Sequence, residues 1–81
     1  MEIKILGPGC KNCLALDARV KEVLAELGLS AQVEKVTDMQ EIMRYDILMT
    51  PGLVINGKVK VFGRVPSHDE IKQWISAEQQ S

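Results

Sequence analysis

The spacing of apolar residues changes after residue 10 of this chain, from every second position to every third or fourth. Residues 2–6 alternate polar and apolar side chains, with Ile3 and Ile5 on one face, which is typical of a β-strand. A helical spacing begins at residue 11 and ends before Gly28, which suits a C-terminal cap. The apolar positions of this helix are Leu14, Leu16, Val20, Val23, Leu24 and Leu27. The sequence therefore predicts a strand over residues 2–6 and a helix over residues 11–27.

The next segments continue the alternation of strand and helix. Residues 31–36 alternate again and predict a second strand. A short second helix begins at Asp38, which is followed three positions later by a glutamate, as in a capping box. We expect Met39, Ile42 and Met43 of this helix to face the core.

A β-hairpin and a final helix complete the chain. Residues 53–62 carry apolar side chains on both sides of Asn56-Gly57, a pair that suits the positive φ angles of a type I′ turn. Ser67 and Glu70 have the spacing of a capping box and predict the start of the last helix. The buried stripe of that helix is expected to consist of Ile71, Trp74 and Ile75. Residues 77–81 are expected to fray.

The elements follow the order β-α-β-α-β-β-α, which predicts an α/β fold. Strands joined through a helix run parallel, whereas strands joined by a two-residue turn run antiparallel. We therefore predict a four-stranded mixed sheet with helices on both faces. A chain of 81 residues has the size of a single domain, which we assign to residues 1–81.

Charge and hydropathy argue against several functions. The net charge is −1, and lysines and arginines are scattered, so neither nucleic acid nor an anionic membrane is expected as the main partner. The strand pattern begins directly after Met1 and leaves no room for a signal peptide, and no apolar run approaches the roughly 20 residues of a membrane span. We therefore expect a cytoplasmic protein without membrane insertion. A structural disulfide is unusual in that compartment, which favours a catalytic or metal-binding role for a cysteine pair.

The two cysteines stand as Cys10-Lys11-Asn12-Cys13, on the turn between the first predicted strand and the first predicted helix. Two thiols at this spacing can reach each other to form a disulfide. Backbone amides at a helix start stabilise negative charge, and a thiolate is therefore favoured there. Because the thiolate is the species that attacks disulfides, the pattern predicts redox chemistry.

Two further features accompany the cysteine segment, residues 9–13. Thr50-Pro51 stands just before the third predicted strand, and the hairpin over residues 53–62 is followed by the closing helix. With these features the chain resembles the thioredoxin-fold superfamily, and more narrowly its small glutaredoxin-like thioredoxins, the "redox-active disulfide" proteins. The resemblance covers essentially the whole chain and implies the minimal thioredoxin fold.

The resemblance implies a thiol–disulfide oxidoreductase that acts on disulfides of proteins or small molecules. Cys10 would be the attacking thiol, and Cys13, one helical turn further and more buried, would be the resolving thiol. Pro51 would be cis, and the backbone of Thr50 would pair with an extended substrate segment. A reductase or a dithiol would recycle the pair, with no cofactor or metal required. We expect the protein to be a monomer.

The chain departs from the better-known members of the superfamily at two places. Lys11-Asn12 replaces the Gly-Pro pair of thioredoxin and the Pro-Tyr pair of glutaredoxin. Arg64 replaces the second glycine of the segment with which glutaredoxins bind glutathione, although an arginine can bind a carboxylate. Dedicated use of glutathione is therefore not expected.

The alternative function is that of a soft-metal or metalloid carrier that uses the two thiolates. A tetrahedral zinc site needs about four protein ligands, and the chain offers two cysteines and the single His68, which we expect to be solvated. Met39, Met43 and Met49 are expected to fill gaps in the core rather than to bind metal. A docking domain without catalysis is a third possibility, against which the cysteine pair argues.

Overall fold

The computed structural model describes residues 1–80, and the order of their elements confirms the prediction. The elements are β1 (Glu2–Leu6), α1 (Lys11–Leu27), β2 (Gln32–Val36), α2 (Met39–Met43), β3 (Gly52–Ile55), β4 (Lys58–Phe62) and α3 (His68–Gln80). The bounds of β1 and α1 agree with the predicted ranges, and β2 begins one residue later than predicted. The helix α3 continues to Gln80, so the prediction that residues 77–80 fray was wrong. Residue 81, which the same prediction included, lies outside the described residues.

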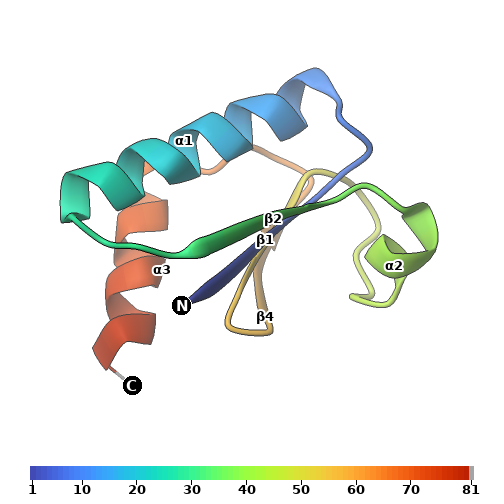
Figure 1. Ribbon diagram of the computed structural model, residues 1–81. Helices are drawn as coiled ribbons and strands as arrows, with labels where there is room; N and C mark the ends of the chain where they lie inside the picture. The colour runs from blue at the N-terminus through green and yellow to red at the C-terminus, as the bar shows by residue number, and fades with distance from the viewer. Residues whose placement is uncertain (81) are drawn as a thin grey trace.

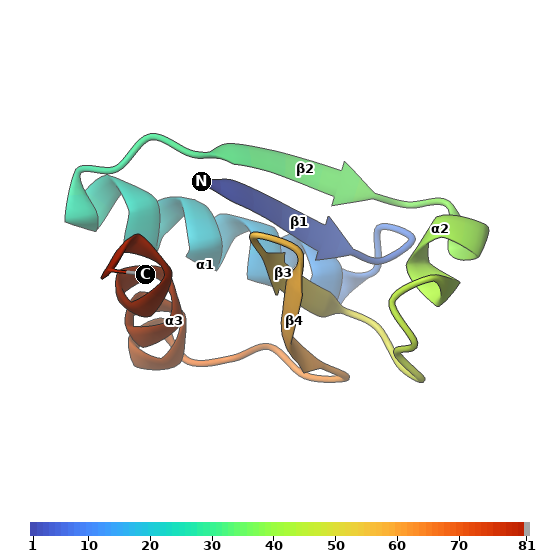
Figure 2. The ribbon, with the colours of Figure 1, turned by 90° about the horizontal axis from the view of Figure 1, so that it is seen from below.

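The strands form one mixed sheet in the order β2-β1-β3-β4 (Figure 2). The α1 crossover makes β1 and β2 parallel, with Ile3 opposite Val33, whereas β3 is antiparallel to both β1 and β4. Asn56 and Gly57 have φ angles of 50° and 81°, as the predicted type I′ turn requires.

Helices lie on both faces of the sheet because alternate strand residues point to opposite sides. One face meets α1 and α3, and α2 stands apart from them at the end of the sheet where β1 and β2 finish (Figures 1 and 2). The buried residues of the first cluster are Ile3, Ile5, Leu16, Val20, Val23, Leu24, Leu53, Ile55, Ile71 and Ile75. Those of the second, smaller cluster are Leu6, Val36, Ile42 and Val54.

The expectation that the methionines fill the core was wrong. Met39, Met43 and Met49 are 53%, 67% and 62% exposed. The helix α2 has only 5 residues, so a single position, Ile42, faces the sheet. Trp74 of α3 packs against the larger core cluster but is only half-buried.

Helix ends follow their sequence signals. Gly28 ends α1 in the left-handed conformation with a φ of 66°. Asp38 caps α2, but its carboxylate accepts from the amide of Gln40, whereas a capping box would use the amide of Glu41. At α3 the capping box is complete: the amide of Glu70 donates to Ser67 Oγ (3.1 Å) and the amide of Ser67 donates to Glu70 Oε1 (3.0 Å).

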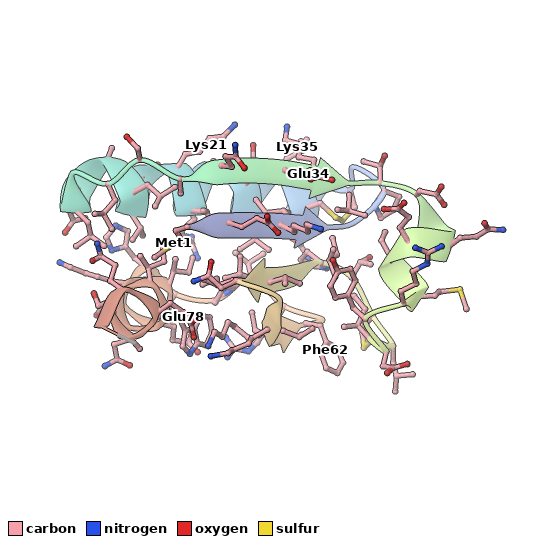
Figure 3. The ribbon with its side chains drawn as sticks, turned by 60° about the horizontal axis from the view of Figure 1, so that its bottom comes forward. Met1, Lys21, Glu34, Lys35, Phe62 and Glu78 are labelled. Carbon is pink, nitrogen blue, oxygen red and sulfur yellow. A yellow bond between two sulfur atoms is a disulfide. The ribbon has the colours of Figure 1, made fainter. Side chains whose placement is uncertain are left out.

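The hairpin is tied to α3 through one carboxylate. Glu78 of α3 reaches toward the hairpin (Figure 3), where its Oε2 accepts from Lys60 Nζ at 2.9 Å and from Lys58 Nζ at 3.3 Å. These lysines and the hydrogen bond from Asn56 lower the pKa of Glu78. The closing helix and the hairpin that follows Pro51 are thus held in a fixed relation.

The Glu70 capping box predicts a pH-dependent contribution to stability. The Arg64 guanidinium and the Ser67 amide lower the pKa of Glu70 to about 2. A carboxyl group with a lowered pKa stabilises the fold above its ordinary pKa, and this contribution is lost as the pH falls through the folded-state value. Glu70→Gln keeps a capping side chain but removes the charge, and we expect it to reduce the free energy of unfolding at pH 7 but not at about pH 2. Urea unfolding of both proteins at several pH values measures this difference. An equal loss of unfolding free energy at pH 7 and at about pH 2 would show that the charge of Glu70 does not cause the difference.

Candidate active site

The two cysteines form a disulfide at the first turn of α1. Cys10 is the N-cap residue, in an extended conformation with φ −68° and ψ 168°, and its Sγ accepts a hydrogen bond from the amide of Cys13 at 3.2 Å. The carbonyl of Cys10 accepts from the amide of Leu14 and thereby begins the helical hydrogen bonds. In the dithiol state, this amide and the helix terminus would stabilise negative charge on Cys10 Sγ.

The two sulfur atoms occupy different surroundings. Cys10 lies half-buried at the rim, whereas Cys13 is only 5% exposed and faces the end of β1. Gly7 makes this packing possible, because a Cβ on residue 7 would overlap Cys13 Sγ and would lie 3.2 Å from Cys13 Cβ. The amide of Gly7 donates to the carbonyl of Val36 at 2.9 Å, which holds this backbone in place.

Thr50 and Pro51 lie beside the cysteine pair. The Thr50–Pro51 peptide bond is cis, as the resemblance implied. The same hypothetical Cβ on Gly7 would lie 3.8 Å from Thr50 Cβ, so Gly7 separates Thr50 from Cys13. Pro51 is buried, and its carbonyl accepts from the amide of Gly63 at 2.8 Å. The backbone of Thr50 has no backbone hydrogen bond within residues 1–80, and the residue is partly exposed.

The other candidate residues are engaged elsewhere. His68 Nε2 lies 2.9 Å from Glu26 Oε2, on the C-terminal half of α1. Arg64 binds Glu70 through both terminal nitrogens, at 3.0 and 2.7 Å, and this pairing raises the pKa of Arg64. The arginine thus meets a carboxylate of its own chain. In the part of the chain that the structure describes, no three His, Cys, Asp or Glu side chains are grouped to hold a metal ion.

Gly7 is a site residue that reasoning from the sequence missed. The signal was present, because residue 7 directly follows a strand that enters the cysteine turn. A side chain at that position points toward the first turn of the next helix, and a glycine there permits close approach of the sulfur. By itself, the sequence Gly7-Pro8-Gly9 predicts a turn and does not show which glycine must admit the sulfur.

The fold and the site together define a small thioredoxin-fold protein with a dithiol at a helix start. Comparison with known proteins agrees, because the thioredoxin domain family matches residues 1–76. The chain is 41% identical over 76 residues to "Thioredoxin" of Methanothermobacter thermautotrophicus, covering 94% of this chain and 99% of that protein. It is 38% identical over 75 residues to a "Thioredoxin" of Methanocaldococcus jannaschii, covering 93% and 86% of the two chains.

The chain therefore belongs to the thioredoxin domain family. It is a thiol–disulfide oxidoreductase, and its partners are disulfide substrates and a reductant that regenerates the dithiol. The carrier function is not favoured. Among the described residues, no helix has the length and apolar character needed to cross a membrane.

The contact at Gly7 predicts that even one methyl group there disturbs the site. Gly7→Ala places a Cβ into the position of Cys13 Sγ, and we expect it to lower the free energy of unfolding of the oxidised protein by about 1–3 kcal/mol, as overpacking does. Equilibrium unfolding in urea measures the loss. In a Cys13→Ala background, which lacks the sulfur, the same substitution should cost clearly less. An equal cost in both backgrounds would show that Gly7 does not act through Cys13.

Proposed function

We propose that Cys10 is the attacking thiol and Cys13 the resolving thiol of this oxidoreductase. The observation that carries the proposal is the difference between their surroundings. Cys10 Sγ is at the rim and accepts the amide hydrogen of Cys13, whereas Cys13 is 5% exposed. A substrate disulfide can therefore reach Cys10 but not Cys13, and Cys10 is the thiol whose thiolate the helix start favours.

The reaction proceeds in two exchanges. The Cys10 thiolate attacks one sulfur of the substrate, the substrate disulfide breaks, and its second sulfur leaves as a thiolate. Cys13 then attacks Cys10 Sγ, the Cys10–Cys13 bond forms, and the first substrate sulfur leaves with its electron pair. The substrate is reduced by two electrons, and a reductase or a dithiol later reduces the protein disulfide.

Thr50 and Pro51 bind the substrate backbone in this proposal. A backbone without internal hydrogen bonds can pair with an extended peptide, as the edge of a sheet does. The two residues before Thr50, Leu48 and Met49, are 90% and 62% exposed, which suits contact with a polypeptide. Arg64 is already bound to Glu70, which favours a protein reductase or a dithiol over glutathione as the reductant.

The proposed working form is a single-domain monomer of the cytoplasm. The intermolecular steps above require one Cys10–Cys13 pair per chain. The monomeric state, the single domain over residues 1–81 and the cytoplasmic location stay predictions from the sequence.

Substitution of each cysteine separates the two roles. We expect Cys10→Ser to abolish reduction of a disulfide substrate, because it removes the attacking sulfur. Cys13→Ser should still attack but should accumulate a mixed disulfide between Cys10 and the substrate, because the resolving thiol is missing. Mass spectrometry of the non-reduced protein detects that adduct. Normal turnover of both variants, or an adduct on Cys13 in place of Cys10, would contradict the assigned roles.

Thr50→Pro tests pairing through the backbone, because proline lacks the amide hydrogen. We expect kcat/KM for a peptide disulfide to fall by about fivefold, which corresponds to the loss of roughly 1 kcal/mol of hydrogen bonding. For a small disulfide without a peptide backbone, kcat/KM should change little. Thr50→Ala is the matched control, because it removes the side chain but keeps the amide. An equal loss for both substrates, or the same loss in Thr50→Ala, would argue against backbone pairing.

A further inference from the structure

The connection between β4 and α3, residues 63–67, is hydrogen-bonded to the loop that carries Pro51 (orange in Figure 2). Its first residue, Gly63, donates its amide hydrogen to the carbonyl of Pro51 at 2.8 Å. Met49 lies against the same glycine, because a Cβ on residue 63 would be 3.3 Å from Met49 Cβ. The position of Gly63 therefore fixes the peptide group that directly follows Thr50-Pro51.

The middle of this connection lacks the usual backbone support. Residues 64–66 form no hydrogen bonds with other backbone groups within residues 1–80. A segment of this kind opens locally unless side chains hold it. Arg19 of α1 supplies such a hold, because its NH1 donates to the carbonyl of Pro66 at 2.8 Å. Pro66 is buried and has no amide hydrogen, so this carbonyl is its only backbone group that can form a hydrogen bond.

The other contacts of the connection lead to α3 and to the core. Arg64 binds the carboxylate of Glu70, and the same carboxylate accepts from the amide of Ser67. Val65 packs against the larger core cluster. Among the described residues, Arg19 thus supplies the one hydrogen bond that links the connection to the helix that carries the cysteines.

We propose that Arg19 is a positioning residue for the substrate-binding backbone at Thr50. The inference rests on the pairing of Thr50 with an extended substrate that is proposed above. Arg19 fixes the carbonyl of Pro66 and thereby the connection. At the other end of the connection, the Gly63 amide holds the carbonyl of Pro51. Because α1 begins at the cysteine pair, one helix places the attacking sulfur and also holds the backbone that binds the peptide.

Three variants test this role. Arg19→Met removes the guanidinium but keeps an unbranched apolar side chain. Arg19→Lys is the conservative variant, because its ammonium group can still donate to the carbonyl of Pro66. Lys72→Met is the matched control, because Lys72 of α3 also ties α1 to α3, through Glu26 at 3.0 Å, and this ion pair does not involve residues 63–67.

The first measurement is amide hydrogen exchange by NMR, which needs no substrate. We expect the Gly63 amide to exchange about two- to tenfold faster in Arg19→Met than in the wild type, the factor that one hydrogen bond represents. The amide of Asn56, which donates to the carbonyl of Glu2 at the other end of the hairpin, should keep its rate. In Lys72→Met, both rates should equal those of the wild type.

The second measurement is the steady-state reduction of a peptide disulfide and of a small disulfide without a peptide backbone. We expect Arg19→Met to raise KM for the peptide by about two- to fivefold with little change in kcat, as a loss of binding does. The small disulfide should be reduced as before, and Arg19→Lys should recover most of the loss. In a Thr50→Pro background, which already lacks the pairing amide, Arg19→Met should cause no further loss.

The two measurements separate failure of this inference from failure of the proposed function. An unchanged exchange rate at Gly63 overturns the role of Arg19, and so does a peptide KM that rises equally in Lys72→Met. A peptide kcat/KM that falls in Thr50→Pro but not in Arg19→Met also overturns it. If Thr50→Pro itself has no effect on the peptide, the pairing at Thr50 fails instead, whatever the exchange rate at Gly63. If Arg19→Met does not fold, Arg19→Gln is measured in its place, since its shorter side chain also removes the guanidinium.

Discussion

The close approach of Cys13 Sγ to the backbone of Gly7 is the contact on which the site depends. Gly7 follows β1 directly, its amide is bound to the carbonyl of Val36 at the end of β2, and it has no side chain to keep α1 at a distance. The neighbouring residue of β1, Leu6, pairs with Gly52, the first residue of β3. The chain before Gly52 is Thr50-Pro51, so the same strand end positions the cysteine turn and the Pro51 loop. Three segments that are distant in sequence are thereby fixed against one another by backbone contacts.

Much of the fold could be predicted because its longer elements carry complete periodic patterns. The α1 stripe spans several turns and ends at a glycine that adopts the left-handed conformation, so both of its bounds could be predicted. The Asn56-Gly57 turn and the Ser67–Glu70 capping box involve only residues close in sequence. Both could therefore be predicted from the residue types alone, and both form as predicted. The helix α2 could not be treated in the same way. In a helix of 5 residues, spacing does not distinguish the one buried position, Ile42, from the exposed methionines around it.

The candidate site was predictable to a different degree at each residue. The cysteines could be identified as site residues from their spacing and their place before a helix. Thr50-Pro51 could be identified only through the resemblance to a family. The contact of Gly7 with Cys13 and the burial of Asp17 depend on packing across the fold. The sequence places Asp17 one turn after Cys13, but its burial and its pairing with Lys35 arise only when β2 packs beside α1. Such long-range pairings have no local signature.

A single helical turn thus supplies two sulfur atoms with opposite requirements. At the N-cap, Cys10 has a backbone amide to stabilise its thiolate and lies where a substrate can reach it. Cys13 is enclosed by Gly7 and the sheet, which protects it from substrates but also separates its proton from water. The same burial that hides Cys13 from a substrate leaves Cys10 as the sulfur that a substrate can meet first.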